Sequence, residues 1–263
     1  MIKLAIHGAC GRMGQRIAAL ALQDEAFQLT AAVDQPGHPL LGQDIGILAA
    51  AMVAGVKITD TLTAEADVLI DFSLPAGTMA CAEFCRKHAL PLVVGTTGLG
   101  EAEKQCLRQA AEKTAIVVAA NMSLGVNLLF KLVGQVAQAL GDAYDIEIVE
   151  THHRFKKDAP SGTALELARQ IAAAQSWDFP ACLEHGREGK QSLRQAGTIG
   201  MHAVRLGDTV GDHSVCFGAL GETIELRHSA HTRDTFARGA LRAALWLAGK
   251  PAGWYGMNDV LGL

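Results

Sequence analysis

The chain has 263 residues, of which 49% are hydrophobic and 19% are charged, and its formal net charge is −4. This length accommodates two domains, and this hydrophobic content supplies a folded core and argues against a disordered protein. A duplex-binding protein usually carries a basic field, so nucleic acid is not expected as a partner.

Short apolar runs alternate with helical stretches over residues 1–123. This pattern predicts buried parallel strands joined by helices, which is a doubly wound α/β sheet. The expected strands are Ile2–His7, Leu29–Asp34, Val56–Thr59, Val68–Phe72, Leu92–Val94 and Ile116–Ala119. The expected helices are Arg12–Gln23, Ala76–His88 and Glu101–Lys113.

Beyond residue 123 the pattern changes to that of an α+β domain. The expected elements are a helix over Leu124–Leu140, a strand over Asp145–Thr151, a helix that ends near Ala174, strands between Ala196 and Ser229, and a helix over Arg233–Gly249. Glycines punctuate the strands between Ala196 and Ser229, which is typical of an antiparallel meander. The polar residues 175–195 predict a mobile loop.

We therefore expect two domains. Residues 1–123 and 234–263 form a Rossmann-type dinucleotide-binding domain, and residues 124–233 form an inserted α+β domain for substrate binding and oligomerisation. Lys131 in the middle of the long apolar helix favours a core helix over a membrane span, so no membrane partner is expected. The opening apolar run is too short for a signal peptide, which favours a cytoplasmic location.

The cysteines are scattered along the chain. They are Cys10, Cys81, Cys85, Cys106, Cys182 and Cys216. None forms a CxxC pair, so a structural zinc site is not expected and no metal is assigned. Scattered thiols in an apolar chain suit a reducing compartment.

A glycine-rich turn, GACGRMG at residues 8–14, lies between the first strand and the first helix. Glycine lets the backbone turn tightly and approach a pyrophosphate, whose charge is stabilised at a helix N-terminus. Glycine clusters also serve ordinary turns. Here, however, Asp34 ends the next strand about 20 residues later, where a carboxylate binds the adenosine ribose. This context favours a dinucleotide site.

The residue after Asp34 bears on coenzyme choice. An arginine at this position would pair with the 2′-phosphate of NADP, and Gln35 does not carry that charge. Arg12 in the glycine turn is an alternative cation, or simply a solvated residue at a helix start. The expected cofactor is therefore NADH or NADPH, with NADH favoured.

The segment ETHHRFKKDAPSGT at residues 150–163 combines two histidines, an arginine and two lysines with a helix-start signature. Cations and the N–H groups of a helix N-terminus suit a small substrate with carboxylates, and a lysine can donate a proton. Adjacent histidines on an extended chain point to opposite sides, so the two could serve different groups. A solvated basic loop with Ser161 as N-cap explains the same residues equally well.

Five motifs together resemble those of the dihydrodipicolinate reductase (4-hydroxy-tetrahydrodipicolinate reductase) family: GACGRMG, DFSLPAGT, VVGTTG, AANMSLGVN and ETHHRFKKDAPSGTA. The resemblance extends from Ile2 to the C-terminal tail. It implies NAD(P)H-dependent reduction of 4-hydroxy-tetrahydrodipicolinate (dihydrodipicolinate) to tetrahydrodipicolinate in the diaminopimelate route to lysine. It also implies a homotetramer built through the sheet of the inserted domain.

The resemblance further implies roles for individual residues. His152 and Lys156 would be the acid–base pair, with Lys156 the better proton donor, and His153, Gly162 and Thr163 would hold the substrate carboxylates. The residues implied in cofactor binding are Gly8, Ala9, Cys10, Gly11, Arg12, Met13, Asp34, Gly95, Thr96, Thr97, Ala119, Ala120, Asn121 and Met122. Among the departures, Gln35 replaces an arginine often seen in NADPH-tolerant members, and Met122 stands where phenylalanine is common.

Two other functions fit part of the pattern. An aspartate or homoserine type dehydrogenase also joins a Rossmann domain to a sheet domain, although the segment 150–163 argues against it. A catalytically silent NADH-sensing protein would keep Gly8, Gly11 and Asp34 but would need no histidine–lysine pair.

Overall fold

The structure is a computed structural model that describes residues 1–63 and 65–263. The chain divides into two compact units. Unit 1 contains Met1–Leu124 and Arg233–Leu263, and unit 2 contains Gly125–Thr232. Each unit is described by itself.

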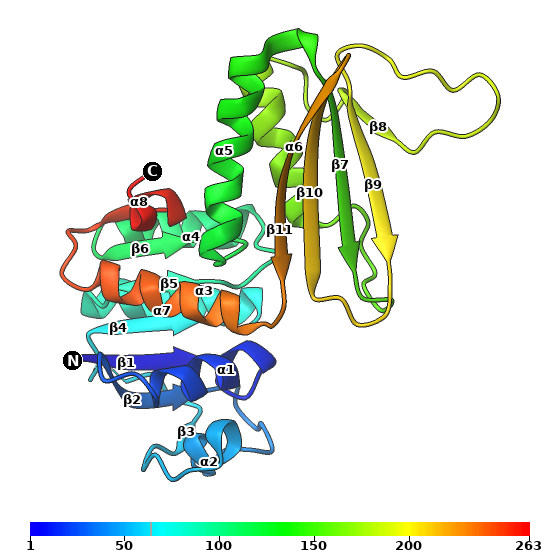
Figure 1. The fold of residues 1–263 in the computed structure, drawn as a ribbon. Coiled ribbons are helices and arrows are strands. Elements are labelled where there is room, and N and C mark those ends of the chain that lie inside the picture. Colours follow the sequence, from blue (N-terminus) through cyan, green and yellow to red (C-terminus); the bar gives the residue numbers. More distant parts are fainter. Residues whose placement is uncertain (64) are drawn as a thin grey trace. The chain divides into compact units, whose positions relative to one another are not determined.

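Unit 1 is built on a seven-stranded sheet in the order β12-β6-β5-β4-β1-β2-β3, with every neighbouring pair parallel (Figure 1). Its strands are β1 (Ile2–His7), β2 (Phe27–Val33), β3 (Ile58–Thr59), β4 (Val68–Asp71), β5 (Leu92–Val94), β6 (Ala115–Val118) and β12 (Gly253–Tyr255). The order β3-β2-β1-β4-β5-β6 is that of a Rossmann fold, which confirms the predicted doubly wound sheet.

Helices cover both faces of this sheet. They are α1 (Arg12–Ala21), α2 (Ile45–Ala50), α3 (Pro75–His88), α4 (Glu101–Ala111), α7 (Asp234–Leu247) and α8 (Met257–Leu261). Val68 and Ile70 of β4 share one core cluster with α1 and α7, whereas Leu69 packs in another with α3 and α4. Successive strand residues face opposite sides, so a strand covered on both faces is apolar throughout.

The C-terminal segment completes this unit. Helix α7 belongs to unit 1 and packs in its core. The tail, for which no regular structure was expected, forms β12 and α8, and β12 extends the sheet by pairing with β6. Trp254 and Tyr255 supply the aromatic residues of this strand, which suit a sheet edge.

Unit 2 contains a five-stranded sheet in the order β11-β10-β7-β9-β8. Its elements are α5 (Leu124–Leu140, whose first residue belongs to unit 1), a 3₁₀ turn (Gly141–Ala143), β7 (Asp145–His152), α6 (Gly162–Gln175), β8 (Leu183–His185), β9 (Ile199–Arg205), β10 (Gly211–Ala219) and β11 (Glu222–Ala230). Both α5 and α6 share one apolar core with the inner face of this sheet.

The predicted antiparallel meander is wrong in one respect. Strands β10 and β11 do form an antiparallel hairpin, but β9 pairs in parallel with β7 on the opposite side of β7 from β10. Glycines mark where a chain turns, but partner choice depends on burial. The side chains of Ile199 and Met201 lie in the core beside Ile146 and Ile148. The expected loop over residues 175–195 also contains a short strand, β8.

Helix α5 begins the segment Leu124–Ala143, which is long and apolar enough to cross a membrane by length and composition alone. One such helix is weak evidence, because core helices pass the same test. About a quarter of its most apolar window, 28%, is buried. Leu129, Val133 and Ala137 make up much of that face and pack in the core of unit 2, as expected for a core helix.

Two glycines inside helices differ in the space around them, which yields a test of the packing. A Cβ on Gly239 of α7 would overlap the carbonyl oxygen of Met122, whereas a Cβ on Gly134 of α5 would meet only the carbonyl oxygen of Gln170 at 3.6 Å. We expect Gly239→Ala to lower the free energy of unfolding by about 1–3 kcal/mol through overpacking. We expect Gly134→Ala to raise it by about 0.5–1 kcal/mol through helix propensity. Urea denaturation of both variants measures this, and equal effects would contradict the packing described.

Candidate functional site

In unit 1 the predicted cofactor residues gather at the carboxyl ends of parallel strands, where dinucleotides bind in such sheets. The glycine turn follows β1, and its position is set by two backbone bonds. The N–H groups of Gly8 and Ala9 both donate to the carbonyl of Val33 at the end of β2, at 2.9 and 3.0 Å. The turn is thus fixed beside Asp34, the next residue.

The glycines of this turn are required by close backbone contacts. Gly8 has a φ of +79°, and a Cβ there would lie 2.5 Å from the carbonyl oxygen of Phe72. A Cβ on Gly14 would overlap the carbonyl oxygen of Gly8. Gly11 is the N-cap of α1, and it has no side chain that could accept a hydrogen bond from the first N–H groups of this helix. These N–H groups can therefore donate to a ligand. These features fit a pyrophosphate at the helix N-terminus.

Asp34 is held in place by backbone donors. Its carboxylate accepts from the N–H of Cys10 at 2.7 Å and from the N–H of Gln35 at 2.8 Å. The structure therefore brings the turn Gly8–Met13 and Asp34 together, as predicted. Arg12 is exposed at the start of α1.

The predicted nicotinamide side lies at the ends of β5 and β6. The ring of Phe72 packs so closely on Gly95 that any Cβ there would overlap it. The Thr96 hydroxyl accepts from the N–H of Ser73 at 3.0 Å. Ala119 is joined to β5 by its N–H, which donates to Val94 at 3.1 Å. The segments around Thr96–Thr97 and Ala119–Met122 are therefore anchored to adjacent strand ends.

Asp71, at the end of β4, is a residue for which sequence reasoning assigned no role. Its fully buried carboxylate accepts from His7 Nδ1 at 2.8 Å, Thr78 at 2.5 Å, Thr96 at 2.9 Å and the N–H of Ser73 at 3.2 Å. Burial alone would raise the pKa of Asp71, but the contact with His7 and these hydrogen bonds outweigh it and hold the pKa below its usual value. His7 is therefore one of several donors to the Asp71 carboxylate, which also positions Thr96.

In unit 2 the buried face of β7 carries the second group of predicted residues. His152 and Glu150 both point to this face, and His152 Nδ1 lies 2.5 Å from Glu150 Oε2. Arg205 of β9 donates to both oxygens of Glu150 at 2.9 Å. The N–H of Ser161 donates to the same carboxylate at 3.0 Å. Glu150, which sequence reasoning left without a role, joins β7, β9 and the start of α6.

These contacts set the protonation states. Burial raises the pKa of Glu150, but hydrogen bonds from Arg205 and His152 outweigh it, so the pKa is lowered and the group is ionised. Burial lowers the pKa of His152, Glu150 opposes this, and the charges of Lys156 and Arg205 reinforce it. His152 is therefore neutral near pH 7. Since its Nδ1 faces an ionised carboxylate, its Nε2 is the free acceptor.

The start of α6 is organised by Ser161. Its hydroxyl accepts from the N–H of Ala164 at 3.1 Å, which confirms its N-cap role, and it also lies 3.1 Å from His213 Nε2. His213 of β10 packs edge-on against His152, and burial lowers the pKa of His213 to about 4. Gly162 and Thr163 occupy the first turn of α6, where backbone N–H groups point out of the helix end.

The basic loop after β7 differs from the extended chain assumed from sequence. The N–H of Lys156 donates to the carbonyl of His153 at 3.1 Å, so residues 153–156 form a turn. Lys156 Nζ pairs with Asp158 at 3.0 Å, and its side chain is 21% exposed, whereas Lys157 is exposed. His153 Nδ1 is buried and has no hydrogen-bond partner among the described residues. The His153 side chain as a whole is partly exposed, so only this one ring nitrogen is shielded from solvent.

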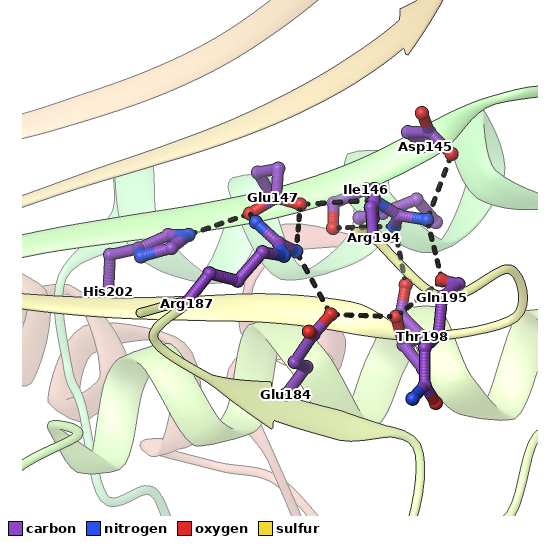
Figure 2. A network of polar contacts seen from close by, with 9 residues as sticks. All are labelled: Asp145, Ile146, Glu147, Glu184, Arg187, Arg194, Gln195, Thr198 and His202. Atoms are coloured by element: carbon purple, nitrogen blue, oxygen red, sulfur yellow. Dashed lines mark hydrogen bonds and ion pairs between the residues drawn. The ribbon is translucent and has the colours of Figure 1, made fainter. Parts of the chain in front are cut away.

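Glu147, three residues before Glu150, carries a similar network on the outer face of the same strand. Figure 2 shows its carboxylate between His202, Arg187 and Arg194. The distances to these side chains are 2.6, 2.7 and 3.1 Å. A Cβ on the facing Gly200 would overlap this carboxylate. The network binds residues 187–198 to β7 and β9 and contains none of the predicted site residues.

Comparison with known proteins covers both units. Residues 2–122 match the family model described as the N-terminus of dihydrodipicolinate reductase, and residues 125–261 match the model of its C-terminus. A dipicolinate-bound dihydrodipicolinate reductase from Paenisporosarcina sp. TG-14 is similar in structure, with 26% identity, 97% of each chain covered and a TM-score of 0.75.

Structures at lower identity share the fold alone. An amine dehydrogenase from Mycobacterium smegmatis has 12% identity over 97% of this chain and 94% of its own, with a TM-score of 0.65. An oxidoreductase from Agrobacterium radiobacter, in complex with NAD+, L-tartaric acid and magnesium, has 12% identity over 91% and 85%, with a TM-score of 0.58. These matches show that the fold occurs in other proteins, and they carry no assignment of activity.

Glu147 and Glu150, on opposite faces of β7, provide a matched test of the Glu150–His152 contact. We expect Glu150→Gln to lower the pKa of His152 further, because a carboxylate that favours the imidazolium is lost while the charges of Lys156 and Arg205 remain. Glu147→Gln removes the same charge on the other face and should leave the pKa unchanged. An NMR titration of the His152 ring measures this, with near-ultraviolet circular dichroism to report folding. An unchanged or higher pKa in Glu150→Gln would contradict the arrangement.

Proposed function

The chain belongs to the dihydrodipicolinate reductase family, and on this premise we propose how its residues perform the reaction. The protein is an NAD(P)H-dependent oxidoreductase that reduces dihydrodipicolinate in the synthesis of lysine and diaminopimelate. The observation that carries this conclusion is the match of both family models, which together span residues 2–122 and 125–261. An aspartate or homoserine type dehydrogenase, the alternative enzyme, does not account for it.

The residues of unit 1 fit a dinucleotide. The turn Gly8–Gly14 allows the pyrophosphate to approach the N-terminus of α1, and Asp34 presents a fixed carboxylate to ribose hydroxyls. We assign the nicotinamide half to Gly95–Thr97 and Ala119–Met122, which lie at the ends of β5 and β6. When bound, the reduced cofactor supplies the hydride. The residues of the chain bind it and orient it.

Asp34 and Gln35 support use of NADH. Two ribose hydroxyls suit the Asp34 carboxylate, whereas a 2′-phosphate would bring a second negative charge against it. Gln35 carries no positive charge that could pair with a 2′-phosphate. Arg12 carries one, but its side chain is exposed. NADH is therefore proposed as the better coenzyme.

The substrate site is proposed in unit 2, at the start of α6. A small dicarboxylate fits His153, whose buried Nδ1 has no partner among the described residues, and the first turn of α6 at Gly162 and Thr163. The similar reductase that was solved with dipicolinate supports a dicarboxylate ligand. Glu150 ties the beginning of this helix to His152, so the acid–base residue and the anion-binding turn share one anchor.

Lys156 is proposed as the proton donor. Reduction adds a hydride to one end of an electron-poor double bond and a proton to the other, and the ammonium of Lys156 can supply that proton. His152 is neutral because its pKa is lowered, so it has no extra proton to donate near pH 7. Its proposed role is to orient or share the proton. Asp158 positions the ammonium of Lys156 through an ion pair of 3.0 Å. Lys156 then regains a proton from solvent.

We further propose a cytoplasmic homotetramer that binds neither nucleic acid nor membrane. The two helices of unit 2 share a core with the inner face of its sheet, which leaves the outer face for contact with other copies. The net charge of −4 does not favour nucleic acid. The packed face of α5 supports a core helix rather than a span.

The coenzyme proposal is tested by measuring kcat/KM for NADH and NADPH through absorbance at 340 nm. We expect NADH to be used at least as well as NADPH. A preference for NADPH above about tenfold, or about 1.4 kcal/mol, would show that Arg12 or another cation reads the 2′-phosphate. Absence of turnover with either coenzyme would instead favour the alternative of a silent NADH-binding protein.

The Lys156 proposal is tested by substitution. Lys156→Ala should lower kcat by roughly a hundredfold or more while NADH binding stays near wild type, because the ammonium acts as charge develops. The matched control is Lys157→Ala, since the neighbouring side chain is exposed. His153→Ala should mainly raise the substrate KM. If Lys156→Ala keeps most of the wild-type kcat, or Lys157→Ala is equally damaging, the proton donor must be sought at His152.

A further inference from the structure

Three side chains with different ligand atoms meet beside the glycine turn of unit 1. Cys10, Asp34 and His38 each offer one sulfur, oxygen or nitrogen atom, and these three atoms all lie within 4.8 Å of one another. Cys10 comes from the turn after β1, Asp34 follows β2, and His38 lies in the loop beyond it. Cys10 belongs to the glycine turn assigned to the cofactor, but that assignment uses the backbone of the turn and gives no role to the Cys10 thiol or to the His38 ring.

The cluster holds a proton that a cation can replace. The thiol of Cys10 donates a hydrogen bond to the Asp34 carboxylate. Two backbone N–H groups already orient the Asp34 carboxylate. His38 Nδ1 accepts a long bond of 3.2 Å from the N–H of Leu40, which positions the ring. A divalent cation between sulfur and carboxylate would displace the thiol proton to solvent.

The donor set suits zinc. Zinc binds sulfur at about 2.3 Å and nitrogen or oxygen at about 2.0–2.2 Å, which corresponds to ligand separations of roughly 3.3–3.6 Å in a tetrahedron. Since no pair of these atoms is more than 4.8 Å apart, they need to approach by no more than about 1.5 Å, which side-chain rotation allows because all three residues are partly exposed. Three protein ligands leave the fourth position to water. We propose that Cys10, Asp34 and His38 form a zinc site whose occupation competes with the dinucleotide for Asp34.

A second group of potential metal ligands in unit 1 is less suited to a cation because it is buried. His7, Asp71 and Cys81 also lie within reach of one cation, but all three are buried. The Asp71 oxygens already accept from His7, Ser73, Thr78 and Thr96. A metal there would have to break a satisfied network, whereas at Cys10 it replaces one shared proton. The competition, but not the metal binding itself, rests on the proposed role of Asp34 in binding ribose.

Cobalt(II) is the probe for the ligand set, because a thiolate ligand gives an intense charge-transfer absorption and a tetrahedral site gives visible bands. Titration of the wild-type protein should show both signals, and zinc should remove them. Cys10→Ser should abolish the charge-transfer band, whereas Cys106→Ser, which alters another half-buried thiol, should retain it. His38→Gln should weaken zinc binding by about tenfold or more without changing the KM for NADH in chelator-treated enzyme. A band that is absent from wild type or persists in Cys10→Ser would overturn the site.

Calorimetric titration of NADH with and without saturating zinc separates the two proposals. Competition should weaken NADH binding by at least tenfold in wild type and much less in His38→Gln. If zinc binds with the cobalt signature but NADH binding is unaffected, the competition fails and so does the assignment of Asp34 to the ribose. If NADH binds and turns over normally but no metal binds, the zinc site alone is overturned.

Discussion

The arrangement of unit 2 depends on the hydrogen bonds and ion pairs of the buried Glu150 carboxylate. A charge inside a protein is tolerated only when ionic partners and hydrogen bonds replace its water. Here the bidentate Arg205, His152 and the N–H of Ser161 do so. Each donor comes from a different part of unit 2, so the cost of leaving the charge unpaired holds β7, β9 and α6 in one arrangement. The same arrangement joins His152 and the start of α6 to one carboxylate.

Unit 1 uses a second buried carboxylate in a related way. Asp71 collects donors from the end of β1, from α3 and from the turns after β4 and β5. It therefore fixes Thr96 without offering an oxygen to a ligand. Glu147 is a contrasting case, because its equally crowded carboxylate lies on the outer face of β7 and fastens residues 187–198. On β7, a carboxylate bound by several donors therefore lies among the predicted site residues on the inner face, as Glu150 does, or fastens a loop on the outer face, as Glu147 does.

The Asp34 carboxylate differs from the buried carboxylates of Glu150 and Asp71 because it is partly exposed. Backbone N–H groups fix its orientation, and the nearby Cys10 and His38 side chains are only partly buried. A carboxylate held in this way can accept from ribose hydroxyls or share a cation. The fixed orientation of the Asp34 carboxylate supports both the ribose site and the zinc site. Only the zinc site requires His38.

Much of this protein follows from sequence alone. Burial on both faces makes the parallel strands continuous apolar runs, so β1, β4 and β5 and the helices α1, α3 and α4 could be predicted from the sequence, with ends shifted by a few residues. The short helix α2 was not predicted. The glycine turn and Asp34 were predictable because their spacing reflects local geometry. The segment 150–163 pointed to the family because its order of residues is so specific. The roles of its individual residues remain predictions.

Contacts between distant residues were decided by the tertiary structure. The parallel pairing of β9 with β7, the extra strand β12, the Glu150–Arg205 pair and the meeting of Cys10 with His38 have no local signature. Which strand pairs with which depends on how apolar faces are buried together, and which polar group is buried depends on the donors that the completed fold brings to it. Sequence therefore determined most of the elements, the glycine turn and the family. Partner choice and the buried networks required the fold, because desolvation is a property of the assembled chain.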